Sequence, residues 1–105
     1  MSKGYVILTE EIHDPAGMQR YAEASMPALR EHGGRLLVAD APIETLEGEW
    51  HGTRTVVVEF DSVERARAWY RSDGYQAALP LRQAASQSHV VIVEGWAPRS
   101  PAKAG

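Results

Sequence analysis

Short apolar runs alternate along the chain with segments of helical period. Four runs rich in β-branched residues predict strands, and they are Tyr5–Ile12, Arg35–Asp40, Arg54–Phe60 and His89–Trp96. Between the first two strands, apolar positions step by three and four residues from Met18 to His32, which is typical of one helix face. After the third strand, the pattern predicts two further helical segments over Val63–Ser72 and Tyr75–Ala85.

Capping residues mark the ends of the first helix. Asp14 offers a side-chain acceptor for an N-cap, and Pro15 suits the first helical position. The Gly33-Gly34 pair favours the left-handed backbone that ends a helix. Pro27 lies inside the pattern and predicts a kink or a break.

The order of the elements is β-α-β-β-α-β, which predicts an α+β ferredoxin-like fold. In this fold a four-stranded antiparallel sheet carries its helices on one face. The strand centres read VIL, LLVA, VVV and VVIV, so apolar residues run on without polar ones between them. Continuous apolar strands indicate burial on both faces. Because the helices cover one face only, we expect a homodimer packed sheet to sheet, a dimeric α/β barrel.

Composition sets the class of protein. The 105 residues suit one domain, predicted over residues 1–96, with a disordered tail over 97–105. A net charge of −3 argues against a nucleic-acid surface or a polybasic membrane anchor. The longest apolar runs, such as Val90–Val93, are far shorter than the roughly 18–20 residues of a membrane span. We therefore expect a cytoplasmic protein with no nucleic-acid or membrane partner.

The chain contains no cysteine, which excludes disulfides, zinc–thiolate sites, iron–sulfur clusters and a cysteine nucleophile. Its four histidines form no metal-binding spacing with carboxylates, so we expect no metal site and no cofactor. Haem is the one exception to consider, and its ligand would come from His32 or His51.

Five phrases support a resemblance to a known family. In chain order they are HGGRLLVA (32–39), LEGEW (46–50), VVVEF (56–60), ARAWYRSDGYQAALPLR (66–82) and VEGW (93–96). Together they resemble the uncharacterised family called domain of unknown function 1330, of the dimeric α/β-barrel superfamily, over roughly Tyr5 to Trp96. The resemblance implies the fold and the dimer but no reaction. Other branches of the superfamily include cofactor-free monooxygenases, haem proteins and lactone isomerases, and they imply a ligand between helices and sheet.

One ion pair can be placed from strand register. Pairing Leu37 with Val57 across two antiparallel strands puts Arg35 opposite Glu59. This pair is either a structural contact at the sheet edge or an arginine held for an anionic substrate group. We name Arg35 as a candidate substrate-binding residue and Glu59 as a candidate catalytic carboxylate.

Three further residues have both a structural and a functional interpretation. His32 suits the end of a helix dipole, or it acts as a general base. Trp50 lies in the long connection Ala41–Thr53 and either covers a ligand or anchors the loop on a partner subunit. Trp69 is either core or the aromatic wall of a pocket. We take His32 as candidate catalytic, and Trp50 and Trp69 as candidate substrate-binding residues.

Glu94 interrupts the apolar run of the last strand. A buried carboxylate needs a partner or a raised pKa, and Arg82 is the expected partner. Arg82 is also a candidate substrate-binding residue.

These residues favour a cofactor-independent enzyme, of proton-transfer, isomerase or monooxygenase-like type, acting on a small apolar or aromatic acid. In this hypothesis Arg35 binds the acid and His32 moves the proton. Two alternatives stay open, namely a dimer that binds a small molecule without changing it and a purely structural dimer.

Overall fold

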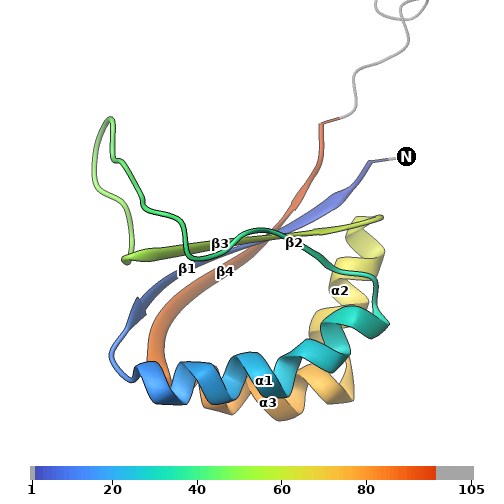
Figure 1. The fold of residues 1–105 in the computed structure, drawn as a ribbon. Helices are drawn as coiled ribbons and strands as arrows, with labels where there is room; N and C mark the ends of the chain where they lie inside the picture. Colours follow the sequence, from blue (N-terminus) through green and yellow to red (C-terminus); the bar gives the residue numbers. More distant parts are fainter. Residues whose placement is uncertain (1, 97–105) are drawn as a thin grey trace, which may run out of the picture.

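The computed structural model describes residues 2–96, and its elements alternate as the sequence pattern predicts (Figure 1). In chain order they are β1 (Gly4–Ile12), α1 (Pro15–Glu31), β2 (Arg35–Val38), β3 (Arg54–Phe60), α2 (Val63–Arg71), α3 (Asp73–Ala85) and β4 (Ser86–Glu94). The predicted disordered tail, residues 97–105, lies outside the described part of the chain. None of the helices in residues 2–96 is long and apolar enough to cross a membrane.

The strands form one antiparallel sheet in the order β2-β3-β1-β4. The helices lie together on one side of it, and the connection between β2 and β3 extends away on the other side (Figure 1). This arrangement confirms the predicted α+β ferredoxin-like fold.

The predicted caps define α1. The Asp14 carboxylate accepts a hydrogen bond of 3.1 Å from the Gly17 backbone N–H, and Gly33 has the positive φ of 73° that glycine adopts without strain. The helix runs through Pro27 as one element, so the predicted break is absent. Proline removes a single helical hydrogen bond, and packing of α1 against α3 on one flank holds the helix together.

The strand boundaries differ from prediction most at β2 and β4. Strand β2 ends at Val38, and a bulge places Val38, rather than Leu37, opposite Val57. The expected pairing of Leu37 with Val57 is therefore wrong. The predicted pairing of Arg35 with Glu59 is confirmed, because the bulge follows that pair.

Strand β4 begins at Ser86, directly after α3, whereas the sequence predicts His89 as its start. The first three residues of the strand, Ser86-Gln87-Ser88, are polar, so the apolar pattern does not predict them as strand. They pair with the far end of β1, where Glu10 stands opposite Ser88.

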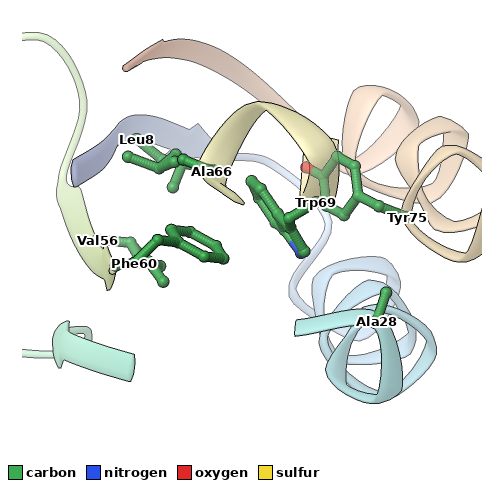
Figure 2. Close-up of a cluster of buried hydrophobic side chains, with 9 residues drawn as sticks. Leu8, Ala28, Val56, Phe60, Ala66, Trp69 and Tyr75 are labelled. Carbon is green, nitrogen blue, oxygen red and sulfur yellow. The ribbon is translucent and has the colours of Figure 1, made fainter. Parts of the chain in front are cut away.

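The core fills the space between the helices and the inner face of the sheet. Alternate positions of β1 and β3 point toward the helices and are buried. Figure 2 shows this cluster, in which Phe60 from β3 lies beside Trp69 from α2 and Tyr75 from α3. The ring centroids of Trp69 are 5.4 Å from Phe60 and 4.2 Å from Tyr75. Each large apolar side chain buried here contributes about 1.5–3 kcal/mol to folding.

The outer face of the sheet is apolar but uncovered within one chain. Val91 and Val93 of β4 are 52% and 45% exposed, and Val38 of β2 also lies on the surface. In a single chain the helices thus bury only the inner face of the sheet. The outer face, which the continuous apolar runs also make apolar, stays exposed.

Candidate functional site

A cavity of about 90 Å³ lies between α1, α2 and the inner face of the sheet. Most of its wall is apolar, and two charged residues stand at the end where β1 and β3 carry Glu10 and Arg54. The apolar and weakly polar wall residues are Leu8, Tyr21, Ala22, Ser25, Met26, Leu29, Leu36, Val56, Val58 and Trp69. Leu36 is half exposed, so the cavity reaches the surface beside β2.

Strand periodicity places Glu10 in this cavity. Val6, Leu8 and Glu10 alternate with outward-facing residues, so all three share the inner face of β1. The Glu10 side chain is 1% exposed and occupies a position at which the pattern elsewhere has an apolar residue. Sequence reasoning missed Glu10, although its period-two phase with Val6 and Leu8 was a readable signal.

The Glu10 carboxylate is incompletely paired. Its Oε1 lies 3.5 Å from Arg54 Nη1 but accepts no hydrogen bond from any described residue. Its Oε2 accepts a long bond of 3.5 Å from Ser88 Oγ. Burial raises the pKa of Glu10, and the charges of Arg54 and Arg82 oppose that rise. The result is a carboxyl group that titrates closer to neutrality than an ordinary glutamate.

Arg54 is shared between two carboxylates. Its Nε lies 3.0 Å from Asp40 Oδ1, and its Nη1 faces Glu10. The positive charge at this end of the cavity is therefore compensated by the protein itself.

Hydrogen bonds link two tyrosines to Arg82 near the charge of Glu10. The hydroxyl oxygens of Tyr21 and Tyr75 are 2.9 Å apart, and Arg82 Nε donates to Tyr75 Oη over 3.3 Å. The guanidinium carbon of Arg82 also lies 5.9 Å from the Tyr21 ring centroid. Burial raises the pKa of Tyr21, so its hydroxyl stays neutral in the cavity wall.

A second unpartnered polar atom belongs to Trp69, a residue of the cavity wall. Its side chain is 3% exposed, and its indole Nε1 has no hydrogen-bond partner among residues 2–96. In Figure 2 this nitrogen lies on the ring edge turned toward α1, the helix that carries Ala28. The indole N–H is thus enclosed by the surrounding protein.

The sequence-predicted pair Arg35 and Glu59 forms on the other face of the sheet. Arg35 Nε donates to Glu59 Oε1 over 2.9 Å, and Tyr5 Oη donates to Glu59 Oε2 over 2.9 Å. These two hydrogen bonds, the one from Arg35 first, lower the pKa of Glu59. Arg35 also bonds Asp61 at 3.0 Å. The cluster is largely exposed and is separated from the cavity by the sheet.

Two other candidates also lie outside the cavity wall. His32 Nδ1 lies 2.9 Å from the Ala28 carbonyl oxygen, at the C-cap of α1. Trp50 is half exposed, and its Nε1 donates to Thr55 Oγ1 over 2.9 Å. Of the six candidates from the sequence, Trp69 alone lines the cavity. The roles assigned to the others stay predictions.

The expected pair of Glu94 with Arg82 is wrong. Glu94 is exposed at the end of β4, whereas Arg82 is buried and bonds Tyr75. Glu94 shares the inner phase of Val90 and Ile92 but is the last residue of β4, so the carboxylate lies in water without need of a partner.

The histidines named for haem have other contacts. His51 Nδ1 lies 2.8 Å from Thr9 Oγ1, and its ring stacks on His89 with centroids 3.8 Å apart. Within residues 2–96, no group of three or more His, Asp or Glu side chains is arranged to hold a metal ion. The absence of a cofactor stays a prediction.

The fold defines a ferredoxin-like α+β protein with a pocket between helices and sheet. The sequence profile of the family described as "Domain of unknown function (DUF1330)" matches residues 3–96, nearly the whole described chain. The chain therefore belongs to this family, as the resemblance of its phrases indicates. No curated protein matches the sequence.

Solved structures share the fold at low sequence identity. A Rhodopseudomonas palustris protein of unknown function has a TM-score of 0.73 and 19% identity, covering 92% of this chain and 85% of its own. SnoaB, a cofactor-independent oxygenase from Streptomyces nogalater, has a TM-score of 0.67 and 12% identity, covering 96% and 98%. A dimeric ferredoxin-like protein of unknown function from Jannaschia has a TM-score of 0.59 and 16% identity, covering 87% and 97%.

Proposed function

We propose that the protein is a cofactor-independent enzyme that moves a proton on a small apolar or aromatic weak acid, held in the cavity beside Glu10. One observation carries the proposal. A carboxylate that is 1% exposed stands at the end of an apolar cavity, with Oε1 lacking a hydrogen-bond partner among the described residues.

The chemistry follows from the surroundings of Glu10. Burial raises the pKa of Glu10 toward the pH at which a general base works best, and Arg54 favours the charged form that accepts a proton. Glu10 takes a proton from a C–H or O–H group of the ligand and becomes a neutral acid. Glu10 then returns a proton to another atom of the ligand, so the reaction is an isomerisation that needs no oxidant or reductant. Exchange of the Glu10 proton with solvent before its return lets deuterium enter the ligand in D2O.

The charge balance favours a neutral ligand over a carboxylate. Arg54 already faces Glu10 and Asp40, so a carboxylate ligand would meet no free cation at this end of the cavity. In this proposal Glu10 holds the role of base that the sequence pattern suggests for His32. The acid is a weak carbon or hydroxyl acid that needs no arginine.

The proposal includes a homodimer formed by the outer sheet faces. The exposed apolar residues on that face, such as Val91 and Val93, support a partner. A protein of the same fold from Jannaschia is described as dimeric, which supports a homodimer. Sheet-to-sheet packing would leave the cavity, on the helix side, open to ligands.

Deuterium exchange tests the proton transfer. The protein is incubated in D2O with a panel of small cyclic ketones and phenols, and deuterium incorporation is followed by NMR. We expect wild-type protein to accelerate exchange into at least one compound, and Glu10→Gln to slow it about 100-fold or more. Glu11→Gln is the matched control, because Glu11 is the exposed neighbour on the same strand.

Two outcomes would overturn the proposal. Exchange that continues unchanged in Glu10→Gln would remove Glu10 as the base. A compound that binds in the cavity but exchanges no faster than in buffer would instead indicate a binding protein without catalysis.

A further inference from the structure

We propose that a second site binds a small organic monocarboxylate, in a cleft between α3 and β4 where the guanidinium of Arg82 pairs with the carboxylate. The cleft has a volume of about 380 Å³ and shares no wall residue with the cavity beside Glu10. Apart from Arg82, its wall is uncharged and is formed by Tyr70, Gln83, Ser86, Gln87, Ser88 and Val90. The site is separate from the proposed reaction, which uses a neutral ligand in the other cavity.

The helical period buries Arg82. Four residues recur at intervals of three and four along α3 and form its buried face, namely Tyr75, Ala78, Arg82 and Ala85. Arg82 is 4% exposed and is the one buried arginine of residues 2–96. Its Nε donates to Tyr75 Oη over 3.3 Å, and its guanidinium carbon lies 5.9 Å from the Tyr21 ring centroid. Two tyrosines therefore fix the position of the charge before any ligand binds.

Arg82 has no carboxylate partner. Arg35 and Arg54 each pair with two carboxylates, whereas Arg82 forms no ion pair within residues 2–96. Buried arginines are normally paired, because removing a charge from water is costly without an opposite charge nearby. An anion in the cleft would supply the missing counter-ion.

The terminal nitrogens of Arg82 can be reached from the cleft. Neither Nη nitrogen donates a hydrogen bond to a described residue, since the bond to Tyr75 comes from Nε. Among residues 2–96, the fully enclosed polar atoms without a partner belong to Glu10, Arg54 and Trp69, so the Nη nitrogens of Arg82 keep accessible surface. Because Arg82 lines the cleft, these donors face a ligand there. The two oxygens of a carboxylate match this pair of nitrogens.

Charge and shape favour an organic monocarboxylate over inorganic phosphate. Arg82 is the one cation in the wall of the cleft, so a ligand with a single negative charge is balanced and a dianion is not. Tyr70 and Val90 pack against the hydrophobic core and give the cleft an apolar part, which suits a hydrocarbon body. The volume of about 380 Å³ exceeds the roughly 150 Å³ of a cavity that binds benzene. Benzoate is therefore a suitable probe.

Ionised Glu10 should weaken the binding of this anion. Ser88 lines the cleft, and its Oγ donates to Glu10 Oε2 over 3.5 Å, so the two negative charges would lie on either side of one side chain. Like charges repel inside a protein. The other charged or titratable groups that act on Glu10 come from β3, α3, the turn after β2 and α1, and they are Arg54, Arg82, Asp40 and Tyr21. We expect the affinity for benzoate to fall as pH rises and Glu10 ionises.

The wild-type protein is tested first, with benzoate, benzamide and inorganic phosphate as probes. Benzamide has nearly the shape of benzoate and no charge. Arginine Nε–H signals are followed in 1H–15N NMR spectra, and the Arg82 signal is assigned from its nuclear Overhauser contacts with the Tyr75 ring. We expect benzoate to move the Arg82 signal, and benzamide and phosphate to bind at least about 10-fold more weakly.

Variants of the cleft then test the role of the charge. Arg82→Gln should weaken benzoate binding about 10-fold or more, because a charge-assisted pair is lost, and should leave benzamide binding unchanged. Arg71→Gln is the control, since Arg71 is an exposed arginine at the end of α2. Gln83 is exposed in the cleft wall, so Gln83→Glu and Gln83→Lys should weaken and strengthen benzoate binding about 3-fold each. These two variants keep the test decisive where Arg82→Gln folds poorly.

Four outcomes would overturn part of the inference. An Arg82 signal that does not respond to benzoate, or equal affinity in folded Arg82→Gln, overturns the site. Equal affinity for benzamide or phosphate overturns the ligand class. Gln83→Glu and Gln83→Lys that bind benzoate alike overturn its place in the cleft. A pH dependence that is absent, or that persists in Glu10→Gln, overturns the effect of Glu10. None of these results bears on the proposed reaction, which the deuterium-exchange assay tests separately.

Discussion

Glu10 and Arg54 stand directly opposite each other on the central strands β1 and β3, and Glu10 Oε1 lies 3.5 Å from Arg54 Nη1. Both side chains lie on the face that otherwise carries the apolar core. A buried ion pair is a poor source of stability, because removing two charges from water offsets most of their attraction. In the proposed function, the pair beside the cavity serves chemistry rather than folding.

Removing Arg54 should destabilise the protein, because Glu10 then loses its ion-pair partner. We expect Arg54→Met to lower the free energy of unfolding by about 3 kcal/mol near neutral pH, because Glu10 is left as an uncompensated buried charge. The double variant with Glu10→Gln should recover most of that loss. Urea denaturation measures both effects.

Arg20→Met serves as the control for the loss of a surface arginine. Arg20 makes a long, exposed contact of 3.9 Å with Asp14, so its removal should cost no more than about 0.5 kcal/mol. Equal losses for Arg20→Met and Arg54→Met would contradict the burial of a charge at Glu10.

The stability of the protein should depend on the titration of Glu10. Its folded-state pKa is raised above the ordinary value of 4.5, so between these two values the folded state binds more protons than the unfolded state. Stability therefore falls as pH rises through that interval. Glu10→Gln should be more stable than wild type at neutral pH and should lose this advantage as pH falls to the ordinary value.

Denaturant melts of wild type, Glu10→Gln and Glu11→Gln over this pH range check the direction. Glu11 is exposed, so Glu11→Gln should follow the wild-type pH dependence. A Glu10→Gln advantage that is the same at every pH would show that ionisation of Glu10 is not its cause.

The Arg35–Glu59 cluster distinguishes the cavity from the other face as the site of chemistry. We expect Arg35→Gln to leave proton exchange and ligand binding unchanged, because the sheet separates this side chain from the cavity. The same deuterium-exchange assay measures it. Loss of exchange in a folded Arg35→Gln protein would move the site to the outer face, as the sequence-based hypothesis has it.

The outer face should hold the dimer together. We expect Val91→Asp to convert the dimer to monomer, since it places a charge in the middle of an apolar face. Native mass spectrometry reads the oligomeric state. Ala24→Asp adds the same charge on an exposed position of α1 and should leave the dimer intact, whereas a wild-type monomer would contradict sheet-to-sheet packing.

The fold was readable from the sequence because it depends on local periods and caps. Helical and strand periods predict every element apart from the polar start of β4, and the Asp14 N-cap and Gly33 turn fix the ends of α1. The register that joins Arg35 to Glu59 also follows from period two. The bulge at Leu37 could not be predicted, because a bulge depends on how β2 pairs with β3 and not on the sequence of either strand alone.

Most of the candidate site could not be predicted from the sequence, because its chemistry depends on which side chains are buried. Glu10 and Glu11 are adjacent identical letters, yet one is buried beside Arg54 and the other is exposed. Only strand phase separates them. Trp69 was placed correctly as a pocket or core residue, but the missing partner of its indole N–H is a property of the packed structure. His32 shows the reverse case, in which a residue type suited to catalysis bonds the end of its own helix.

Proton exchange into a bound ketone, compared between Glu10→Gln and Glu11→Gln, tests the central claim most directly. Both variants remove one carboxylate from the same strand, and only Glu10 faces the cavity. We expect wild type and Glu11→Gln to exchange at the same rate, which rises with pH through the raised pKa of Glu10, and Glu10→Gln to fall to the rate in buffer. Equal exchange by the two variants would contradict a catalytic carboxylate in this cavity.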